Sequence, residues 1–312
     1  MPKKRKMTRP FRIGTRGSLL AVWQANFIRD LLLSAFPELI PEIQIIRTTG
    51  DRNIDSPPSE IGGKGVFVKE IEEALLSGAV DIAVHSMKDL PAILPDGLII
   101  GAVAKRHDPR DALVSKDKLK LGDLPEGARV GTGSLRRGAQ ILNLRPGLSI
   151  KRIRGNVDTR LRKLREGRDY DALMLAAAGL GRMGLIGEAA EIIPADVMVP
   201  APGQGIIAIE CREGDGAALD IISRINHAET WTAGTVERAF LRRLGGDCGI
   251  PAGCYAETHG GSVRVTGMIA SPDGVTVIKE QYSGGAGDAE GIGGRLAELI
   301  LDKGGRGLME PL

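Results

Sequence analysis

Cysteine is the strongest nucleophile that this sequence offers, and one of its three cysteines occupies a segment that would expose it. Cys248 lies in LGGDCGIPAG at 244–253, a Gly- and Pro-rich loop in which a thiol can reach solvent. Cys211 ends the apolar run IIAIEC and is expected to be buried and inert, whereas Cys254 fits either setting. Reactive thiols are accessible ones. We therefore expect Cys248 to be the reactive cysteine.

A carboxylate and two lysines lie in further segments that suit a site. VHSMKDLP at 84–91 places Lys88 and Asp89 just beyond a predicted buried strand, where α/β folds commonly hold their reactive groups. Asp89 could act as a general acid or base, but an Asp before Leu-Pro is also ordinary turn chemistry, and both interpretations stay open. GGKG at 62–65 is either a flexible loop or a lid in which Lys64 closes over an anion.

Hydroxyl and guanidinium groups gather where a strand is predicted to meet a helix. GTGSLRR at 131–137 leaves backbone N–H groups and the hydroxyls of Thr132 and Ser134 free to hold an anion. Arg136 and Arg137 add planar forks that pair with carboxylates, although a solvated helix face would explain one of the pair.

A second segment repeats this pattern. RGNVDTRL at 154–161 puts Arg154 at a strand end and Arg160 in the first helical turn, where a cation opposes the helix dipole unless an anion is bound. Residues 136–165 hold ten Arg and Lys in a chain of net charge +3, which favours a small polyanionic ligand over nucleic acid. The cations later in this helix are expected to face solvent: Arg162, Lys163 and Arg165.

Composition narrows the class of protein. Four scattered histidines and no close CxxC pair predict no metal site. Aromatic residues are only 3% of the chain, so an RNA-binding module, which stacks bases on aromatic rings, is disfavoured. No apolar run reaches the roughly 18 residues that span a bilayer, and MPKKRKMTRP lacks the apolar core of a secretory signal, so we expect a cytoplasmic protein without a membrane partner.

Hydrophobic periodicity predicts strands that alternate with helices, which indicates α/β architecture with largely parallel sheets. From about residue 228 the pattern becomes α+β. The predicted strands are 11–15, 44–49, 81–86, 98–104, 112–115, 129–132, 149–153, 171–176 and 206–211, and the predicted helices are 18–36, 67–78, 134–145 and 157–166.

Taken together, the motifs resemble those of the porphobilinogen deaminase (hydroxymethylbilane synthase) family over most of the chain. The matching segments are IGTRGSLLAVWQA at 13–25, IRTTGD at 46–51, GGKGVFVKEIE at 62–72, AVHSMKDLP at 83–91, GTGSLRR at 131–137, RGNVDTRL at 154–161, LAAAGLGRMG at 175–184, APGQGIIAIECR at 201–212 and GDCGIPAG at 246–253. The resemblance implies a transferase of tetrapyrrole (haem) biosynthesis. Such an enzyme joins four porphobilinogen molecules into linear hydroxymethylbilane and releases ammonia.

The resemblance also implies the fold. It comprises two α/β lobes like type II periplasmic binding proteins and a small α+β domain that carries the cofactor. Residues 8–104 with 205–224 would form the first lobe, 105–204 the second, and 225–312 the third domain. The family's cofactor is a dipyrromethane in thioether linkage, here on Cys248, and the family expectation is a monomer.

Site roles follow from the matching positions. Asp89 takes the place of the catalytic carboxylate. The residues that match cofactor-binding positions are Cys248, Lys88, Asp89, Thr132, Ser134, Arg136, Arg137 and Arg160. Substrate-handling positions are matched by Arg16, Ser18, Arg154 and Arg182, and Lys64 and Gln204 lie in matching loops. A non-catalytic anion receptor on the same two-lobed fold is the main alternative, and it would need neither Asp89 nor Cys248.

Overall fold

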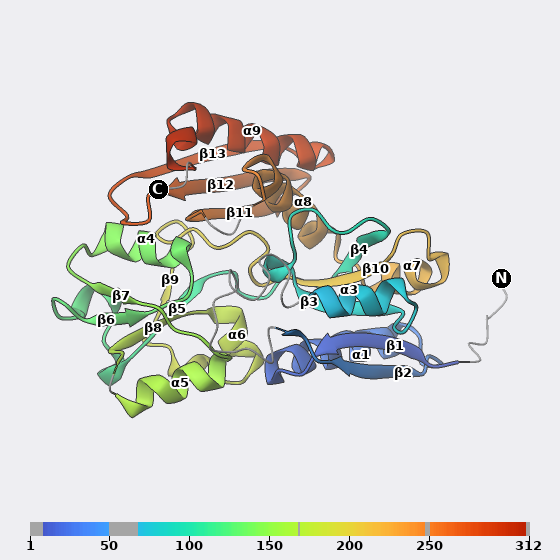
Figure 1. Ribbon diagram of the computed structural model, residues 1–312. Helices are drawn as coiled ribbons and strands as arrows, with labels where there is room; N and C mark the ends of the chain where they lie inside the picture. The colour runs from blue at the N-terminus through green and yellow to red at the C-terminus, as the bar shows by residue number, and fades with distance from the viewer. Residues whose placement is uncertain (1–8, 50–67, 168, 247–249, 310–312) are drawn as a thin grey trace. The chain divides into compact units, whose positions relative to one another are not determined.

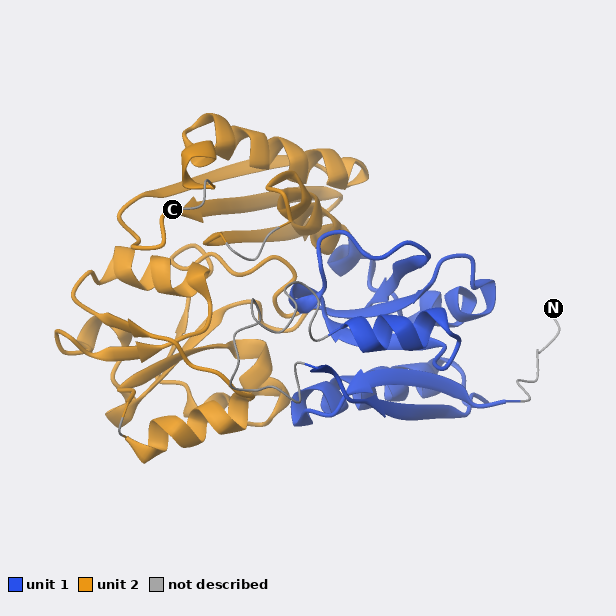
Figure 2. Cartoon of the chain, in the orientation of Figure 1, with its two compact units in different colours: residues 1–105, 206–231 blue, residues 106–205, 232–312 orange. Residues whose placement is uncertain are grey.

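The computed structural model describes residues 9–49, 68–167, 169–246 and 250–309, and these form two compact units. Unit 1 holds residues 1–105 and 206–231, and unit 2 holds residues 106–205 and 232–312 (Figure 2). The chain thus leaves unit 1 and returns to it. Among the described residues no helix is long and apolar enough to cross a membrane.

Unit 1 is built on a five-stranded sheet in the order β2-β1-β3-β10-β4 (Figure 1). Three neighbouring strands are parallel, and β10 runs antiparallel between β3 and β4. Helix α1 packs its apolar stripe on one face of the sheet, and α3 packs on the other. The elements are β1 (Phe11–Arg16), α1 (Leu19–Ala35), β2 (Pro41–Ile46), α3 (Lys69–Leu76), β3 (Ile82–Ser86), β4 (Leu98–Val103), β10 (Ile207–Arg212) and α7 (Gly216–Ile222).

Unit 2 contains a second five-stranded sheet with the same plan, in the order β7-β6-β8-β5-β9. Here β5 is the strand that runs antiparallel to both of its neighbours. Helix α4 covers one face, and α5 and α6 cover the other. The elements are β5 (Asp111–Ser115), β6 (Arg129–Gly131), α4 (Leu135–Leu144), β7 (Ser149–Lys151), α5 (Val157–Glu166), β8 (Ala172–Ala176), α6 (Ala177–Arg182) and β9 (Glu191–Ile193).

A three-stranded antiparallel sheet, β11-β12-β13, completes unit 2. Its core is closed by Phe240 of α8 and by Leu296 and Ile300 of α9. Ala139 of α4 packs against Met268 of β12, which joins this sheet to the α/β part of the unit. The elements are α8 (Ala228–Arg243), which begins in unit 1, β11 (Ala252–His259), β12 (Ser262–Ala270), β13 (Val277–Gly285) and α9 (Ala289–Asp302).

The sequence-based fold class is confirmed, with corrections in detail. The two α/β sheets are mixed rather than largely parallel, because β10 in one and β5 in the other pair antiparallel with both neighbours. Strand β10 returns to its sheet late in the chain, whereas β5 is the first strand of its sheet. The strand expected at 44–49 lies at Pro41–Ile46, and β9 was not predicted. The division into three domains stays a prediction.

A fully buried carboxylate ties three segments of unit 2 together. Glu237 of α8 accepts hydrogen bonds from the Arg106 guanidinium at 2.6 and 3.2 Å, and from the backbone N–H groups of Gly203 and Ala256 at 2.6 and 2.8 Å. A buried charge is tolerated only when it is paired and hydrogen-bonded, and both Glu237 oxygens meet that condition. Glu237 therefore anchors the segment at 106 to the C-terminal sheet.

We predict that Glu237→Gln destabilises the protein by roughly 3 kcal/mol or more, because it leaves the Arg106 guanidinium without its counter-charge. The measurement is the free energy of unfolding from urea titration. Glu229→Gln, at an exposed position on the same helix, is the matched control and should change stability by less than about 0.5 kcal/mol. Equal stability of the two variants would contradict the role of Glu237.

Candidate active site

In unit 1, side chains that could do chemistry follow the ends of two neighbouring strands. Strands β1 and β3 are parallel, so their carboxyl ends share one edge of the sheet. Arg16 is the last residue of β1, and Ser18 follows that strand. Ser86 is the last residue of β3, and Asp89 follows that strand. These groups line one pocket, formed by Arg16, Ser18, Leu20, Ala21, Gln24, Val68, Val84, His85, Ser86 and Asp89.

Helix α1 begins at this pocket. The Ser18 hydroxyl caps the helix by accepting a hydrogen bond from the Ala21 N–H at 3.2 Å. The first turn of this 17-residue helix holds no acidic side chain, so the positive end of the helix dipole is not neutralised locally. Together with the Arg16 guanidinium, this end of α1 attracts a carboxylate.

Asp89 is exposed at the end of a short 3-10 turn, Met87–Asp89, that directly follows β3. The turn is held to the core of unit 1, because Met87 is buried and its N–H donates to the Ile206 carbonyl at 3.0 Å. Lys88 is half-buried in the same turn. Gln24 of α1 secures the preceding residue by donating to the Ser86 hydroxyl at 2.9 Å. An exposed carboxylate on a fixed turn suits proton transfer.

In unit 2, three parallel strands end at one edge of the second sheet. After β6, Thr132 is buried and its hydroxyl accepts from the Ser134 N–H at 3.2 Å, while Ser134 caps α4. Gly133 lies so close to β7's end that an added Cβ would come within 3.1 Å of the Ile153 carbonyl. Only glycine fits this approach without a shift. The structure therefore brings Thr132 and Ser134 beside the segment that leads to Arg154.

Arg154 lies between β7 and α5, Arg160 lies in the first turn of α5, and both are half-buried. The Arg160 guanidinium donates to the Gly155 carbonyl at 2.7 Å, which draws it back over the start of α5. The Asn156 side chain makes no cap hydrogen bond to that helix. This helix N-terminus thus carries guanidinium charge as the sequence predicts.

Arg136 and Arg137 meet a carboxylate that the sequence analysis did not select. Arg136 Nη1 lies 2.7 Å from Asp111 Oδ2, and Arg137 Nη2 lies 2.7 Å from Asp111 Oδ1. Gln204 donates to the same Oδ1 at 2.9 Å and accepts from Arg137 at 3.3 Å. Asp111 is 0% exposed, and the two arginines are 4% and 6% exposed. Four polar side chains thus form one buried network.

The charges of this network do not cancel. Burial opposes ionisation of Asp111, but Arg136 and Arg137 outweigh burial and hold the pKa of Asp111 well below its ordinary value. Burial lowers the pKa of Arg136, and Asp111 counters that shift. One carboxylate therefore faces two guanidinium groups. The excess positive charge suits an anion bound at this edge.

Arg182 is the last residue of α6, and it contacts the first and last segments of the 106–205 part of unit 2, at His107 and Gly205. Arg182 is buried, and its Nη2 lies 2.8 Å from the Gly205 carbonyl and 3.2 Å from His107 Nδ1. Burial and the Arg182 charge lower the pKa of His107, which favours the neutral ring. Gly205 has a φ of +87°, and a Cβ there would clash with the His107 carbonyl.

The described cysteines are unsuited to nucleophilic attack. Cys211 and Cys254 are both fully buried. Burial raises the pKa of Cys211 to about 11, and it also raises the pKa of Cys254. The expectation for Cys211 is confirmed, and the ambiguity over Cys254 is resolved. Cys248 and Lys64 lie outside the described residues.

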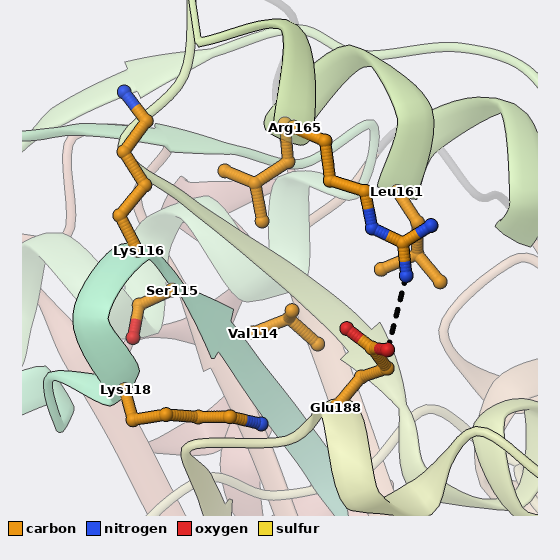
Figure 3. Close-up of a pocket in the computed structure, with 8 residues that line it drawn as sticks. Val114, Ser115, Lys116, Lys118, Leu161, Arg165 and Glu188 are labelled. Carbon is orange, nitrogen blue, oxygen red and sulfur yellow. Dashed lines mark hydrogen bonds and ion pairs between the residues drawn. The ribbon is translucent and has the colours of Figure 1, made fainter.

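A second pocket, in unit 2, contains none of the residues that the sequence analysis assigned to the site (Figure 3). It opens beside Ser115 at the end of β5, whereas Asp111 begins that strand. Arg165 points toward Glu188 across this pocket, with a 3.0 Å ion pair, and its side chain is 63% exposed, as expected for this helix face. This pocket lies at the opposite end of the strand from the Asp111 network.

Two residues that hold these sites together, Asp111 and Gln24, were not selected by the sequence analysis. Asp111 is the last residue of the polar segment KRHDPRD, so nothing local distinguishes it from the other charges there. Its position at the first residue of an apolar strand is the signal that could have found it, because a charged residue in such a run needs a buried partner. Gln24 offers no signal, since it stands in an ordinary amphipathic helix. Among the described residues no group of three or more His, Cys, Asp or Glu could hold a metal ion.

Comparison with protein families matches nearly the whole chain. Residues 11–220 match the family described as porphobilinogen deaminase, dipyromethane cofactor binding domain, and residues 231–302 match porphobilinogen deaminase, C-terminal domain. A porphobilinogen deaminase from Syntrophomonas wolfei subsp. wolfei is 48% identical over 305 residues, covering 96% of this chain and 98% of that protein. One from Geobacillus kaustophilus is 49% identical over 299 residues, covering 96% of both.

Likeness to solved structures is distant. CbnR, a LysR family transcriptional regulator, is 13% identical with a TM-score of 0.42, covering 69% of this chain and 68% of that chain. The periplasmic VFT2 domain of Bordetella pertussis BvgS is 14% identical with a TM-score of 0.41, covering 69% of this chain and 86% of that chain.

We predict that Asp111→Asn destabilises the protein by roughly 3–5 kcal/mol near neutral pH, because it leaves two buried guanidinium groups unpaired. Since the folded-state pKa of Asp111 is depressed, its stabilisation is present above the ordinary value of 3.8 and declines as the pH falls below it. Urea unfolding near neutral pH and below about pH 4 measures both effects. The gap between variant and parent should narrow in acid.

Asp123→Asn, at an exposed position in the same unit, is the matched control. A stability difference for Asp111→Asn that is as small as the control's, or that stays constant with pH, would contradict the network's charge balance.

Proposed function

The chain belongs to the porphobilinogen deaminase family, and we propose that Asp89 and the basic groups at the two sheet edges perform its reaction. The enzyme joins four porphobilinogen molecules into hydroxymethylbilane and releases ammonia, within tetrapyrrole biosynthesis. The observation that carries the residue assignment is the unit 1 pocket, in which Asp89 shares a small space with Arg16 and the start of α1.

Asp89 is the proposed catalytic carboxylate. Porphobilinogen must lose its amine, which leaves positive charge spread over the pyrrole ring. A carboxylate that accepts a hydrogen bond from the pyrrole N–H stabilises that charge. The same group can help protonate the departing amine and later take up the proton released from the ring carbon. Its exposure on a turn held by Met87 and Gln24 supports these roles.

Arg16 and Ser18 are the proposed holders of substrate carboxylates in unit 1. Each porphobilinogen carries an acetate and a propionate, so every addition brings two negative charges. The guanidinium of Arg16 and the dipole of α1 offer the opposite charge in the same pocket as Asp89. Lys88, which precedes Asp89, is the proposed cofactor contact on this side.

The dipyrromethane cofactor of the family fits the residues of unit 2. When bound, it supplies the pyrrole carbon to which the first substrate unit is joined. Its four carboxylates require cations and N–H donors, and the second sheet edge offers both. We propose that Thr132, Ser134 and Arg160 hold it, with Arg154 facing the growing chain. The hydroxyls, helix starts and guanidinium groups described above support this assignment.

The buried arginines contribute in another way. Arg136 and Arg137 are held by Asp111, so their proposed contribution to cofactor binding combines any direct contact with the uncancelled charge of the network. Gln204 is proposed as a positioning residue, because both ends of its amide are used within the network. The resemblance implies that Arg182 handles incoming substrate or the growing chain. Its hydrogen bond to the Gly205 carbonyl supports a positioning role as well.

Cys248 is the proposed point of attachment. A thiolate adds to the electrophile that porphobilinogen forms on losing ammonia, which gives a stable thioether. The burial of Cys211 and Cys254 leaves Cys248 as the remaining thiol of the chain. Lys64 is proposed to contact anionic groups from its glycine-rich loop. We further propose a cytoplasmic monomer that requires neither nucleic acid nor a membrane.

We predict that Asp89→Ala lowers turnover at least 100-fold while the protein stays folded, because the exposed side chain contributes to charge stabilisation and proton transfer rather than packing. The measurement is ammonia release with porphobilinogen as substrate, alongside the thermal unfolding midpoint. Asp96→Ala, another exposed aspartate beyond β3, is the control and should retain parental turnover. Near-normal activity of Asp89→Ala would refute the assigned role.

We predict that native protein carries a dipyrromethane on Cys248 and that Cys248→Ser carries none. Intact-mass measurement followed by peptide mapping tests both statements. Cys211→Ala is the control, because removing a buried thiol leaves the attachment site untouched. An unmodified Cys248 in parent protein that still releases ammonia would remove the attachment assignment. An unmodified protein that releases no ammonia would instead support the anion-receptor alternative.

A further inference from the structure

Three ionisable side chains lie in the apolar layer between α3 and the sheet of unit 1. Glu72 comes from α3, His85 from β3 and Glu210 from β10, and they are 7%, 5% and 0% exposed. His85 Nε2 lies 3.1 Å from Glu210 Oε2. None of the three belongs to the residues assigned above to substrate or cofactor. They are called the Glu72 cluster below.

Strand register puts these groups on one face. Glu210 pairs with Ala83 and His85 pairs with Ala208, so Glu210 and His85 are diagonal neighbours across two antiparallel strands. On the other side of β10, the register with β4 shifts between Ile209 and Glu210, which leaves Gly101 as an extra residue. Such a bulge re-aims a side chain at a sheet position. The bulge therefore helps to set the direction of the Glu210 side chain.

The surroundings of the Glu72 cluster are apolar. Val68, Met87 and Ala208 belong to one buried hydrophobic group of this layer, and Leu75, Val80, Ala83 and Leu98 belong to the other. In such surroundings an unpaired carboxylate is costly. Among the described residues no hydrogen-bond partner is found for Glu72 Oε1, His85 Nε2 or either carboxylate oxygen of Glu210. A buried carboxyl group in this position avoids the cost of an unpaired charge by keeping its proton.

Electrostatics agrees with that geometry. Burial, followed by the nearby Glu210 charge, raises the pKa of Glu72 to about 7, and His85 acts in the opposite direction. Arg212, two residues after Glu210 on β10, turns to the Leu75 and Val80 carbonyls and to Asp215. Arg212 is thus directed to other partners, and the charge balance of the Glu72 cluster depends on its own three members.

Other charged groups on these elements point elsewhere. Glu70 of α3 accepts from Thr49 at 2.7 Å, and Lys69 and Glu73 are exposed on that helix. Asp81, before β3, is paired with Arg9 and Arg12. Strand β4, LIIGAV, carries no ionisable residue. Lys88 and Asp89 follow β3 at the pocket edge.

The Glu72 cluster adjoins the proposed active site. His85 lines the same pocket as Arg16 and Asp89 and directly precedes Ser86. Because β3 continues into the Met87–Asp89 turn, a shift of His85 would move that turn. A change of charge in this layer also acts on the pocket through low-dielectric surroundings, where electrostatic effects are strong.

We propose that Glu72, His85 and Glu210 form one buried charge-balancing cluster beneath the pocket, in which the neutral acid form of Glu72 preserves charge balance and His85 positions the Asp89 turn. The proposal rests on the proposed function of that pocket. When Glu72 gives its proton to solvent, the layer gains one negative charge. That charge repels the carboxylates of porphobilinogen, so substrate capture falls.

The direction of the pH effect follows from the raised pKa of Glu72. A carboxyl group whose folded-state pKa exceeds its unfolded value favours the folded state least when it is ionised. Its contribution therefore worsens as the pH rises from the ordinary value of 4.5 to about 7, and stays unfavourable above. Glu72→Gln keeps the size and neutrality of the protonated acid and removes this dependence.

The test compares holoenzyme of the parent, Glu72→Gln and the exposed control Glu73→Gln. The kcat/KM for porphobilinogen is measured from about pH 6 to about pH 9, with the thermal unfolding midpoint at each pH. We expect the ratio of Glu72→Gln to parent to stay within about twofold at the acid end and to rise at least threefold at the alkaline end, mainly through KM. The unfolding midpoint, followed down to about pH 5, should favour Glu72→Gln over the parent by an amount that grows as the pH rises to about 7 and then stays level.

Several outcomes overturn the proposal. Profiles of Glu72→Gln and parent that superimpose in both measurements would show that Glu72 does not exchange a proton in this range. Failure of Glu72→Gln to fold would show that the charged form is the resident one. Because the unfolding measurement needs no substrate, it decides the state of Glu72 even if the parent proves inactive, and inactivity of the parent overturns only the proposed function.

Discussion

Charge that is removed from water must be balanced inside the protein, and this constraint organises both units. In unit 2, Asp111 neutralises one of two buried arginines and leaves one positive charge at the edge where β6 and β8 end. That arrangement costs stability unless an anion completes it. The dipyrromethane of the family brings four carboxylates, so the uncancelled positive charge would favour its binding. Under the proposed assignment, stability and cofactor binding share one set of side chains.

Unit 1 solves the same problem with fewer cations. Its pocket presents Arg16, the dipole of α1 and the exposed carboxylate of Asp89, which together suit a small molecule carrying both carboxylates and an amine. Beneath that pocket, burial raises the pKa of Glu72 to about 7, and His85 lies 3.1 Å from Glu210. The two units thus differ in how their buried charges are balanced, by arginines in unit 2 and by the three members of the Glu72 cluster in unit 1.

The repeated sheet plan explains why the candidate residues fall where they do. In each α/β sheet three parallel strands end at one edge, and an antiparallel strand begins there and brings a further segment to that edge. In unit 2 this antiparallel strand is β5, whose first residue is Asp111. Arg16 ends one of the parallel strands, and Asp89, Thr132 and Arg154 lie in segments that follow such strands. Glu237 of α8 connects the chain at Arg106 to the C-terminal sheet through Ala256.

The sequence by itself determined the family, the α/β class, most element bounds and the segments that carry reactive groups, because these depend on local patterns: apolar period, Gly- and Pro-rich turns, and strand ends followed by polar residues. Helix α5 was predicted at its observed residues 157–166. Only the tertiary structure decided what each charged side chain faces. Asp111 between two arginines, Gln24 on Ser86, and His85 beside Glu210 are contacts between residues on separate elements and at least 25 positions apart in the chain. Register and packing create those contacts, and no local pattern encodes them.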